Sequence, residues 1–156
     1  LLWWRDQEPK WGLDLEHQSI LGLSAGATLA FLVSGDSTLP SPKALVCGFG
    51  LYDFEALDGR LGRMLPQLLT RSRDEKEWRR ISPLRSRQPD CPTLLLHGDA
   101  DQLTHMDQAH ALTDLRQELG LETNTLIYPR APHGFFNYCD ETSFKAINDI
   151  LHFLKR

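Results

Sequence analysis

Apolar residues gather in four short runs along the chain, each bounded by polar or turn-forming residues. Runs of this length that are almost continuously apolar are typical of strands buried in a sheet. The four predicted strands are residues 19–23, 43–49, 93–97 and 123–128. The second of them follows a turn signal with two prolines, Pro40 and Pro42.

Between and after these runs, apolar residues recur at the spacing of one helix face. We expect a helix of small and apolar residues at 25–32, and another at 106–119 that Gly120 ends. A terminal helix is marked by Phe144, Ile147, Ile150, Leu151 and Leu154. Strands that alternate with helices predict an α/β fold, in which helices cover both faces of a parallel sheet and the crossovers are right-handed.

The stretch 53–80 interrupts this alternation, because it is too long for a simple connection and contains two glycines and a proline. We interpret it as an insertion, or lid, over one end of the sheet. Residues 1–11 have the pattern of the middle of an amphipathic helix without an N-cap, and the first residue is leucine, which suggests a missing N-terminal portion. We therefore expect residues 1–156 to form a single, partial domain.

Composition indicates an ordinary soluble protein, since 41% of the residues are apolar and 24% are charged. The net charge of −4 provides no positive field for a polyphosphate, which argues against a nucleic-acid partner and favours a small or neutral substrate. No apolar stretch approaches the roughly 18 residues of a membrane span, and residues 1–5 do not have the charged-then-apolar pattern of a signal peptide. The compartment and the oligomeric state stay open.

The cysteines predict neither a disulfide framework nor a zinc site, because Cys47, Cys91 and Cys139 are odd in number and widely spaced. Cys47 lies in an apolar run, where we expect it in the core. The histidines form no ligand cluster either, and His110 with Asp114 is a common surface pairing. We expect no metal and no cofactor.

Gly22-Leu-Ser-Ala-Gly26 matches the pattern G-x-S-x-G and lies between a predicted strand and a predicted helix. The pattern alone would arise by chance in roughly one chain in twenty of this length, so the strand-turn-helix context matters more. We expect the turn to strain Ser24 and to expose its side chain at the carboxyl edge of the sheet, near the positive end of a helix dipole. Glycine on both sides would remove Cβ atoms that otherwise collide with the strand and the helix.

A serine attacks at neutral pH only if a base takes its proton and a carboxylate holds that base. The segment His97-Gly-Asp-Ala-Asp101 follows the third predicted strand, and Pro132-His133-Gly134 follows the fourth. Both therefore emerge at the same sheet edge as Ser24. We predict Ser24 as nucleophile, His133 as base and either Asp101 or a nearby carboxylate as the acid, in the chain order of α/β-hydrolases.

The segments G-L-S-A-G, H-G-D-A-D and A-P-H-G-F resemble the nucleophile elbow, acid loop and histidine loop of α/β-hydrolase esterases. The resemblance extends over about residues 13–156 and is greatest to the acetyl-esterase, arylformamidase-like and dienelactone-hydrolase-like groups. It implies the C-terminal half of an α/β-hydrolase fold and Asp101 as the acid. It also implies cleavage of carboxylic esters, preferably with small acyl groups, through an acyl-enzyme on Ser24. Serine exopeptidases and amide hydrolases of the oligopeptidase-like type share the same pattern.

Two other carboxylates are alternatives for the acid. Asp99 would otherwise cap a helix or hold its loop by an Asx turn. Asp53 follows the second predicted strand, an acid position in some members of the superfamily. We expect His97 to be structural, and a solvated or packing role for the remaining histidines His17, His105, His110 and His152.

An oxyanion needs at least two donors, and the first is the backbone N–H of Ala25, the residue after the nucleophile. In the esterases that the chain resembles, the second donor comes from an H-G-G-type loop well before the elbow. This sequence has no such segment before Gly22. A truncated, non-catalytic product is therefore a third interpretation, beside the esterase and the amide hydrolase.

Overall fold

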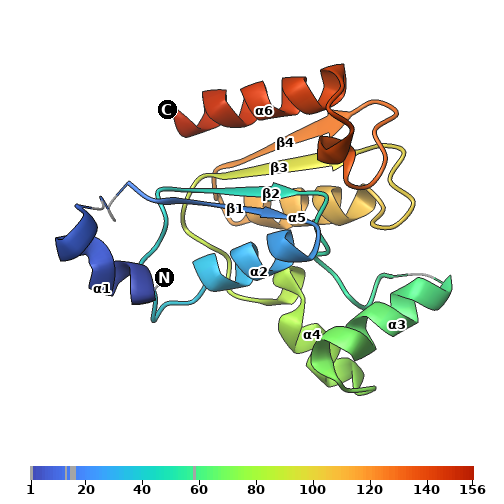
Figure 1. The fold of residues 1–156 in the computed structure, drawn as a ribbon. Coiled ribbons are helices and arrows are strands. Elements are labelled where there is room, and N and C mark those ends of the chain that lie inside the picture. Colours follow the sequence, from blue (N-terminus) through green and yellow to red (C-terminus); the bar gives the residue numbers. More distant parts are fainter. Residues whose placement is uncertain (1, 13, 15–16, 58) are drawn as a thin grey trace.

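A parallel sheet of four strands forms the centre of the fold in the computed structural model, which describes residues 2–12, 14, 17–57 and 59–156. The strands lie in the order in which they occur in the chain (Figure 1). They are β1 (Ser19–Leu23), β2 (Ala44–Gly48), β3 (Thr93–Gly98) and β4 (Thr123–Tyr128). All four predicted strands are confirmed, two of them with the predicted bounds.

Helices follow or precede each strand, as the alternation predicts. The α-helices are α1 (Leu2–Trp11), α2 (Ala25–Ser34), α3 (Gly59–Thr70), α4 (Glu75–Ile81), α5 (Asp107–Glu118) and α6 (Glu141–Leu154). The described residues also form two short 3₁₀ helices, η1 (Pro83–Arg85) and η2 (Phe135–Tyr138). Within the described parts of the chain, no helix combines the length and the apolar character needed to cross a membrane.

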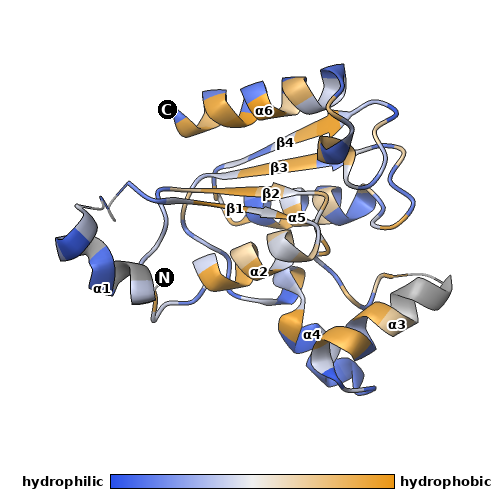
Figure 2. Cartoon of the chain, viewed as in Figure 1, coloured by the Kyte–Doolittle hydropathy of each residue, from blue (hydrophilic) through white to orange (hydrophobic). Residues whose placement is uncertain are grey.

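Each face of the sheet carries its own core, because successive strand residues point to opposite sides. On one face, Val46 and Leu96 pack with α6. On the other face, Cys47 and Leu95 pack with α2 and α5. Figure 2 shows the strands as a hydrophobic layer between these helices. The prediction of a parallel sheet covered on both faces, and of a buried Cys47, is confirmed.

The terminal helix α6 contacts the sheet through a face that matches the sequence pattern only in part, since Ile150 is buried and Leu154 packs against the core. Ala146, Ile150 and Phe153 are buried, whereas the bulky residues Phe144 and Ile147 are 59% and 42% exposed. A small alanine at the contact lets the helix approach the strands closely. Packing distance rather than side-chain size therefore selects the buried face.

The stretch 53–80 contains α3 and all but the last residue of α4, and Figure 1 shows both helices on the same side of the sheet as α2. Asp74 is the N-cap of helix α4, and its carboxylate accepts a hydrogen bond from the N–H of Lys76. None of the α4 residues is buried. The charged segment around α4 is thus a solvated helix, and its role as a lid stays a prediction.

Candidate active site

Ser24 lies at the sharp turn between β1 and α2, at the carboxyl edge of the sheet. Its backbone has φ 54° and ψ −124°, a conformation that non-glycine residues rarely adopt. Its N–H donates to the carbonyl of Gly48 at the end of the neighbouring strand, at 2.9 Å. A strained residue held by its neighbours at a strand end is typical of a functional site.

The two glycines of the motif have different reasons to be glycine. A Cβ atom on Gly22 would overlap the carbonyl oxygen of Gly26 and the backbone of Ala27. A Cβ atom on Gly26 would meet no atom within 4 Å. The expectation that both glycines avoid a collision is therefore wrong for Gly26, because its Cα faces open space while Gly22 is where strand and helix backbones touch.

His133 follows β4 and reaches Ser24 across the sheet edge. Its Nε2 lies 2.9 Å from Ser24 Oγ, although the two residues are 109 positions apart in the chain. The imidazole is 22% exposed and packs edge-on against Phe49, with ring centroids 5.0 Å apart. This contact limits the rotation of the ring and keeps Nε2 directed at Ser24.

Asp101 follows β3, and its carboxylate completes the arrangement. Asp101 Oδ2 lies 2.8 Å from His133 Nδ1, and the residue is 2% exposed. Burial by itself would raise the pKa of the Asp101 carboxyl. The hydrogen bonds that it accepts, from His133 first, outweigh burial and hold this pKa well below its usual range.

The ionised carboxylate determines which nitrogen of His133 carries the proton. A carboxylate only accepts hydrogen bonds, so Nδ1 must be the donor and Nε2 keeps its lone pair. That lone pair faces the hydroxyl of Ser24. The arrangement is therefore able to remove the serine proton as a general base.

The alternative acid Asp99 has a different partner. It is exposed, and its Oδ1 accepts a hydrogen bond from the backbone N–H of Arg130. Beside it, the N–H of Ala100 donates to the carbonyl of Ala131 at 3.2 Å. Asp99 thus ties the acid loop to the loop that carries His133, while Asp101 is the carboxylate bound to the imidazole.

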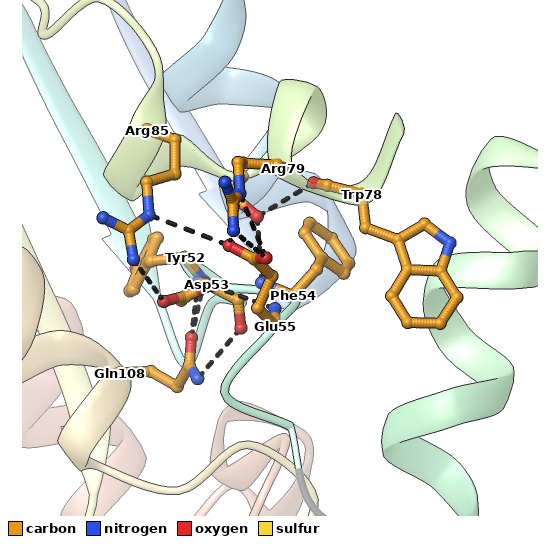
Figure 3. Close-up of polar contacts among 9 residues, drawn as sticks. Tyr52, Asp53, Phe54, Glu55, Trp78, Arg79, Arg85 and Gln108 are labelled. Atoms are coloured by element: carbon orange, nitrogen blue, oxygen red, sulfur yellow. Dashed lines mark hydrogen bonds and ion pairs between the residues drawn. The ribbon is translucent and has the colours of Figure 1, made fainter. Parts of the chain in front are cut away.

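The other alternative, Asp53, belongs to a separate polar network that Figure 3 shows. Its Oδ1 accepts from the N–H of Glu55 at 2.9 Å, and its Oδ2 lies 3.8 Å from Arg85. Gln108, from α5, accepts from the N–H groups of Tyr52 and Asp53 at 2.9 and 2.7 Å. This network holds the loop after β2.

Arg79 of α4 fastens the same loop from the other side (Figure 3). Its guanidinium donates three hydrogen bonds of 2.8–3.0 Å to the Glu55 carboxylate. These hydrogen bonds lower the pKa of Glu55, and no pattern in the sequence indicates them. The loop that carries Phe54 is therefore joined to both α4 and α5.

The remaining histidines behave as expected. His17 and His105 are exposed and pair with Asp14 and Asp107. His110 and His152 are exposed. His97 is fully buried, and its Nε2 lies 2.6 Å from the carbonyl oxygen of Thr104, which agrees with a structural role.

Two residues of the site were not predicted from the sequence. Thr104 places its hydroxyl 2.9 Å from Asp101 Oδ2, and Phe49 holds the ring of His133 from a backbone with φ 38°. Phe49 ends an apolar run and reads as an ordinary core residue. The only signal for Thr104 was a hydroxyl residue three positions after a predicted acid.

Ala25 is the first residue of α2, so its backbone N–H has no acceptor within the helix. It sits directly after Ser24, at the positive end of the helix dipole. This N–H is available to an anion that forms at Ser24. In the described residues, no group of three or more His, Cys, Asp or Glu side chains is arranged to hold a metal ion.

The sequence from residue 8 to residue 156 matches Peptidase_S9, the prolyl oligopeptidase family. The chain belongs to this family. No curated protein sequence matches it significantly.

Solved structures share the fold of this prolyl oligopeptidase family member. A truncated form of a carbohydrate esterase from gut microbiota has a TM-score of 0.78 and 22% identity, over 96% of this chain and 64% of that one. An acylaminoacyl peptidase of Pyrococcus horikoshii has a TM-score of 0.83 and 19% identity, over 97% and 26%. The Francisella virulence factor BioJ has a TM-score of 0.76 and 21% identity, over 99% of this chain and 57% of that one.

The chain thus spans less than two thirds of each of these proteins. At these identities the likeness concerns the fold, and the parallel sheet flanked by helices is that of the α/β-hydrolases. Family membership and fold together support a serine hydrolase.

Proposed function

We propose that this chain carries the catalytic apparatus of a serine hydrolase that cleaves carboxylic esters. Ser24 is the nucleophile, His133 the general base and Asp101 the carboxylate that orients the base. The observation that carries the proposal is the continuous hydrogen-bonded path from Ser24 Oγ to His133 Nε2, at 2.9 Å, and from His133 Nδ1 to Asp101 Oδ2, at 2.8 Å.

The proposed reaction proceeds through an acyl-enzyme. Ser24 Oγ attacks the ester carbonyl carbon while its proton moves to His133 Nε2, and the Ala25 N–H donates to the oxyanion. When the carbon–oxygen bond to the alcohol breaks, the imidazolium returns the proton to the departing oxygen. Water then attacks the acyl-enzyme by the same route and releases the acid and the free serine.

Small acyl groups are the proposed substrates. An apolar cavity of about 150 Å³ lies beside the elbow, and its walls include Ala25, Phe54, Leu69 and Ile81. A cavity of this size holds a group about as large as benzene. Its apolar walls and small volume favour a short hydrocarbon chain over a long or charged one.

Turnover of aryl esters with acyl chains of two, four and eight carbons tests this proposal. We expect the short chains to be cleaved fastest, and Ser24→Ala to abolish turnover of all of them. Ser41→Ala, an exposed serine far from the elbow in sequence, serves as control and should retain full activity. Undiminished turnover in Ser24→Ala would refute the proposal.

Amide cleavage is the second candidate function. The same three side chains also cleave amides, the family is that of prolyl oligopeptidase, and one of the similar structures is an acylaminoacyl peptidase. The rates of hydrolysis of an aryl ester and an aminoacyl anilide, measured on the same preparation, separate the two. Faster cleavage of the anilide would establish the peptidase. Cleavage of neither would favour the non-catalytic interpretation.

A further inference from the structure

Beneath the proposed triad, a buried threonine joins its acid to a second histidine. Thr104 is 1% exposed and His97 is fully buried. The carbonyl oxygen of Thr104 lies 2.6 Å from His97 Nε2, so His97 donates to it. The hydroxyl of the same threonine lies 2.9 Å from Asp101 Oδ2 and 3.2 Å from His133 Nδ1.

The hydroxyl has one proton, and the neighbouring groups decide where that proton points. His133 Nδ1 is itself a donor to the carboxylate, so it offers no lone pair to the threonine. The remaining acceptors are Asp101 Oδ2 at 2.9 Å and the carbonyl oxygen of Phe49 at 3.3 Å. The hydroxyl therefore donates its hydrogen bond to Asp101 Oδ2, which is the closer acceptor and carries the charge.

With that bond made, the carboxylate of Asp101 is fully occupied. Oδ1 accepts from the N–H groups of Leu103 and Thr104, each at 2.9 Å. Oδ2 accepts from His133 and from the Thr104 hydroxyl. A carboxylate has about four lone-pair sites, so its orientation is set by four donors, two of them supplied by Thr104.

We propose that Thr104 is a positioning residue for the site, whose hydroxyl holds Asp101 Oδ2 against His133 Nδ1 while His97 anchors its carbonyl. The proposal rests on the proposed function in so far as it concerns the reactivity of Ser24. Without the hydroxyl, Oδ2 loses one of its two donors, and the carboxylate is less firmly held against His133 Nδ1.

Thr104→Val, which keeps the shape and removes the hydroxyl, is the decisive variant, and Thr104→Ser is its control. The readout is the second-order rate at which a fluorophosphonate modifies Ser24 in the full chain. We expect Thr104→Val to slow this reaction about tenfold or more, and Thr104→Ser to restore it to within about threefold of the wild type. In ester turnover, kcat should fall while KM is unchanged, because Thr104 is buried.

A double-mutant comparison shows whether Thr104 acts through the acid. In an Asp101→Asn background, Thr104→Val should change the fluorophosphonate rate less than about twofold. An additive loss in the double variant, or equal rates for Thr104→Val and the wild type, would overturn the positioning role. Failure of the wild type to react would instead overturn the proposed function.

Proton NMR of the wild type tests the geometry without reference to activity. The Nδ1 proton of His133 should resonate far downfield, and the buried Thr104 hydroxyl should exchange slowly and show a nuclear Overhauser effect to it. This measurement decides the question even if Thr104→Val does not fold. Absence of the Overhauser effect, with the Nδ1 proton observed, contradicts the proposal.

Discussion

At the residue scale, three aspartates follow strands at the same sheet edge, and their partners distinguish them. Asp101 is bound to His133, Asp99 to the backbone of Arg130, and Asp53 to Glu55 and Arg85. Chain order narrowed the acid to a few candidates. The hydrogen bonds favour Asp101, because its carboxylate is the one bound to His133 Nδ1, and we propose it as the acid.

Replacement of these aspartates by asparagine tests the assignment. Asp101→Asn should lower ester turnover by up to about four orders of magnitude, since the amide no longer fixes the productive tautomer. Asp99→Asn and Asp53→Asn should lower it far less. Circular dichroism on each variant checks that the fold is retained. If Asp99→Asn or Asp53→Asn shows the large loss of ester turnover instead, the acid is wrongly assigned.

The low pKa of Asp101 also predicts how stability changes with pH. The carboxyl titrates near 3.9 in the unfolded chain and well below that in the folded protein, so the unfolded state binds more protons as the pH falls. The contribution of the ionised Asp101 carboxylate to the free energy of unfolding is therefore complete above about pH 5 and decreases below it. In denaturant unfolding, the difference between the free energies of unfolding of the wild type and Asp101→Asn should be constant above about pH 5, begin to shrink below it and go on shrinking below about pH 3. A difference that is constant at all pH values would contradict the lowered pKa.

At the element scale, the elbow depends on a close approach of β1 and α2 at Gly22. Gly22→Ala should lower the free energy of unfolding by at least about 1–3 kcal/mol and displace Ser24, because the new Cβ overlaps the Gly26 carbonyl. Gly26→Ala is the matched control. It should keep activity and change stability by less than about 1 kcal/mol, in the stabilising direction. Equal losses of stability and activity from both substitutions would contradict the close approach of α2 to β1 at Gly22.

The rotation of α6 about its axis is testable by a second matched pair. Phe153 is 6% exposed and packs on the sheet, whereas Phe144 is 59% exposed. Phe153→Ala should lower the free energy of unfolding by about 3–5 kcal/mol. Phe144→Ala should change it by no more than about 0.5 kcal/mol. Urea unfolding monitored by circular dichroism measures both. A larger loss in Phe144→Ala would mean that the helix presents the other face.

At the scale of the whole molecule, the parts that local patterns encode were predictable. Strand positions follow from apolar runs, and the meeting of Ser24, Asp101 and His133 follows because parallel strands deliver their following loops to one edge. The roles of Thr104, Phe49 and Arg79 depend on contacts between distant segments. No periodicity or motif encodes these contacts, so only the folded structure reveals them.

The central claim is that the fold makes Ser24 the reactive nucleophile, and covalent labelling tests it most directly. The full chain is treated with a fluorophosphonate, digested and examined by mass spectrometry, beside Ser24→Ala, His133→Ala and the control Ser41→Ala. We predict one adduct, on the peptide that contains Ser24, which is absent in Ser24→Ala, strongly reduced in His133→Ala and unchanged in Ser41→Ala. An adduct that persists in Ser24→Ala, or a wild-type chain that takes up no probe, would contradict the account.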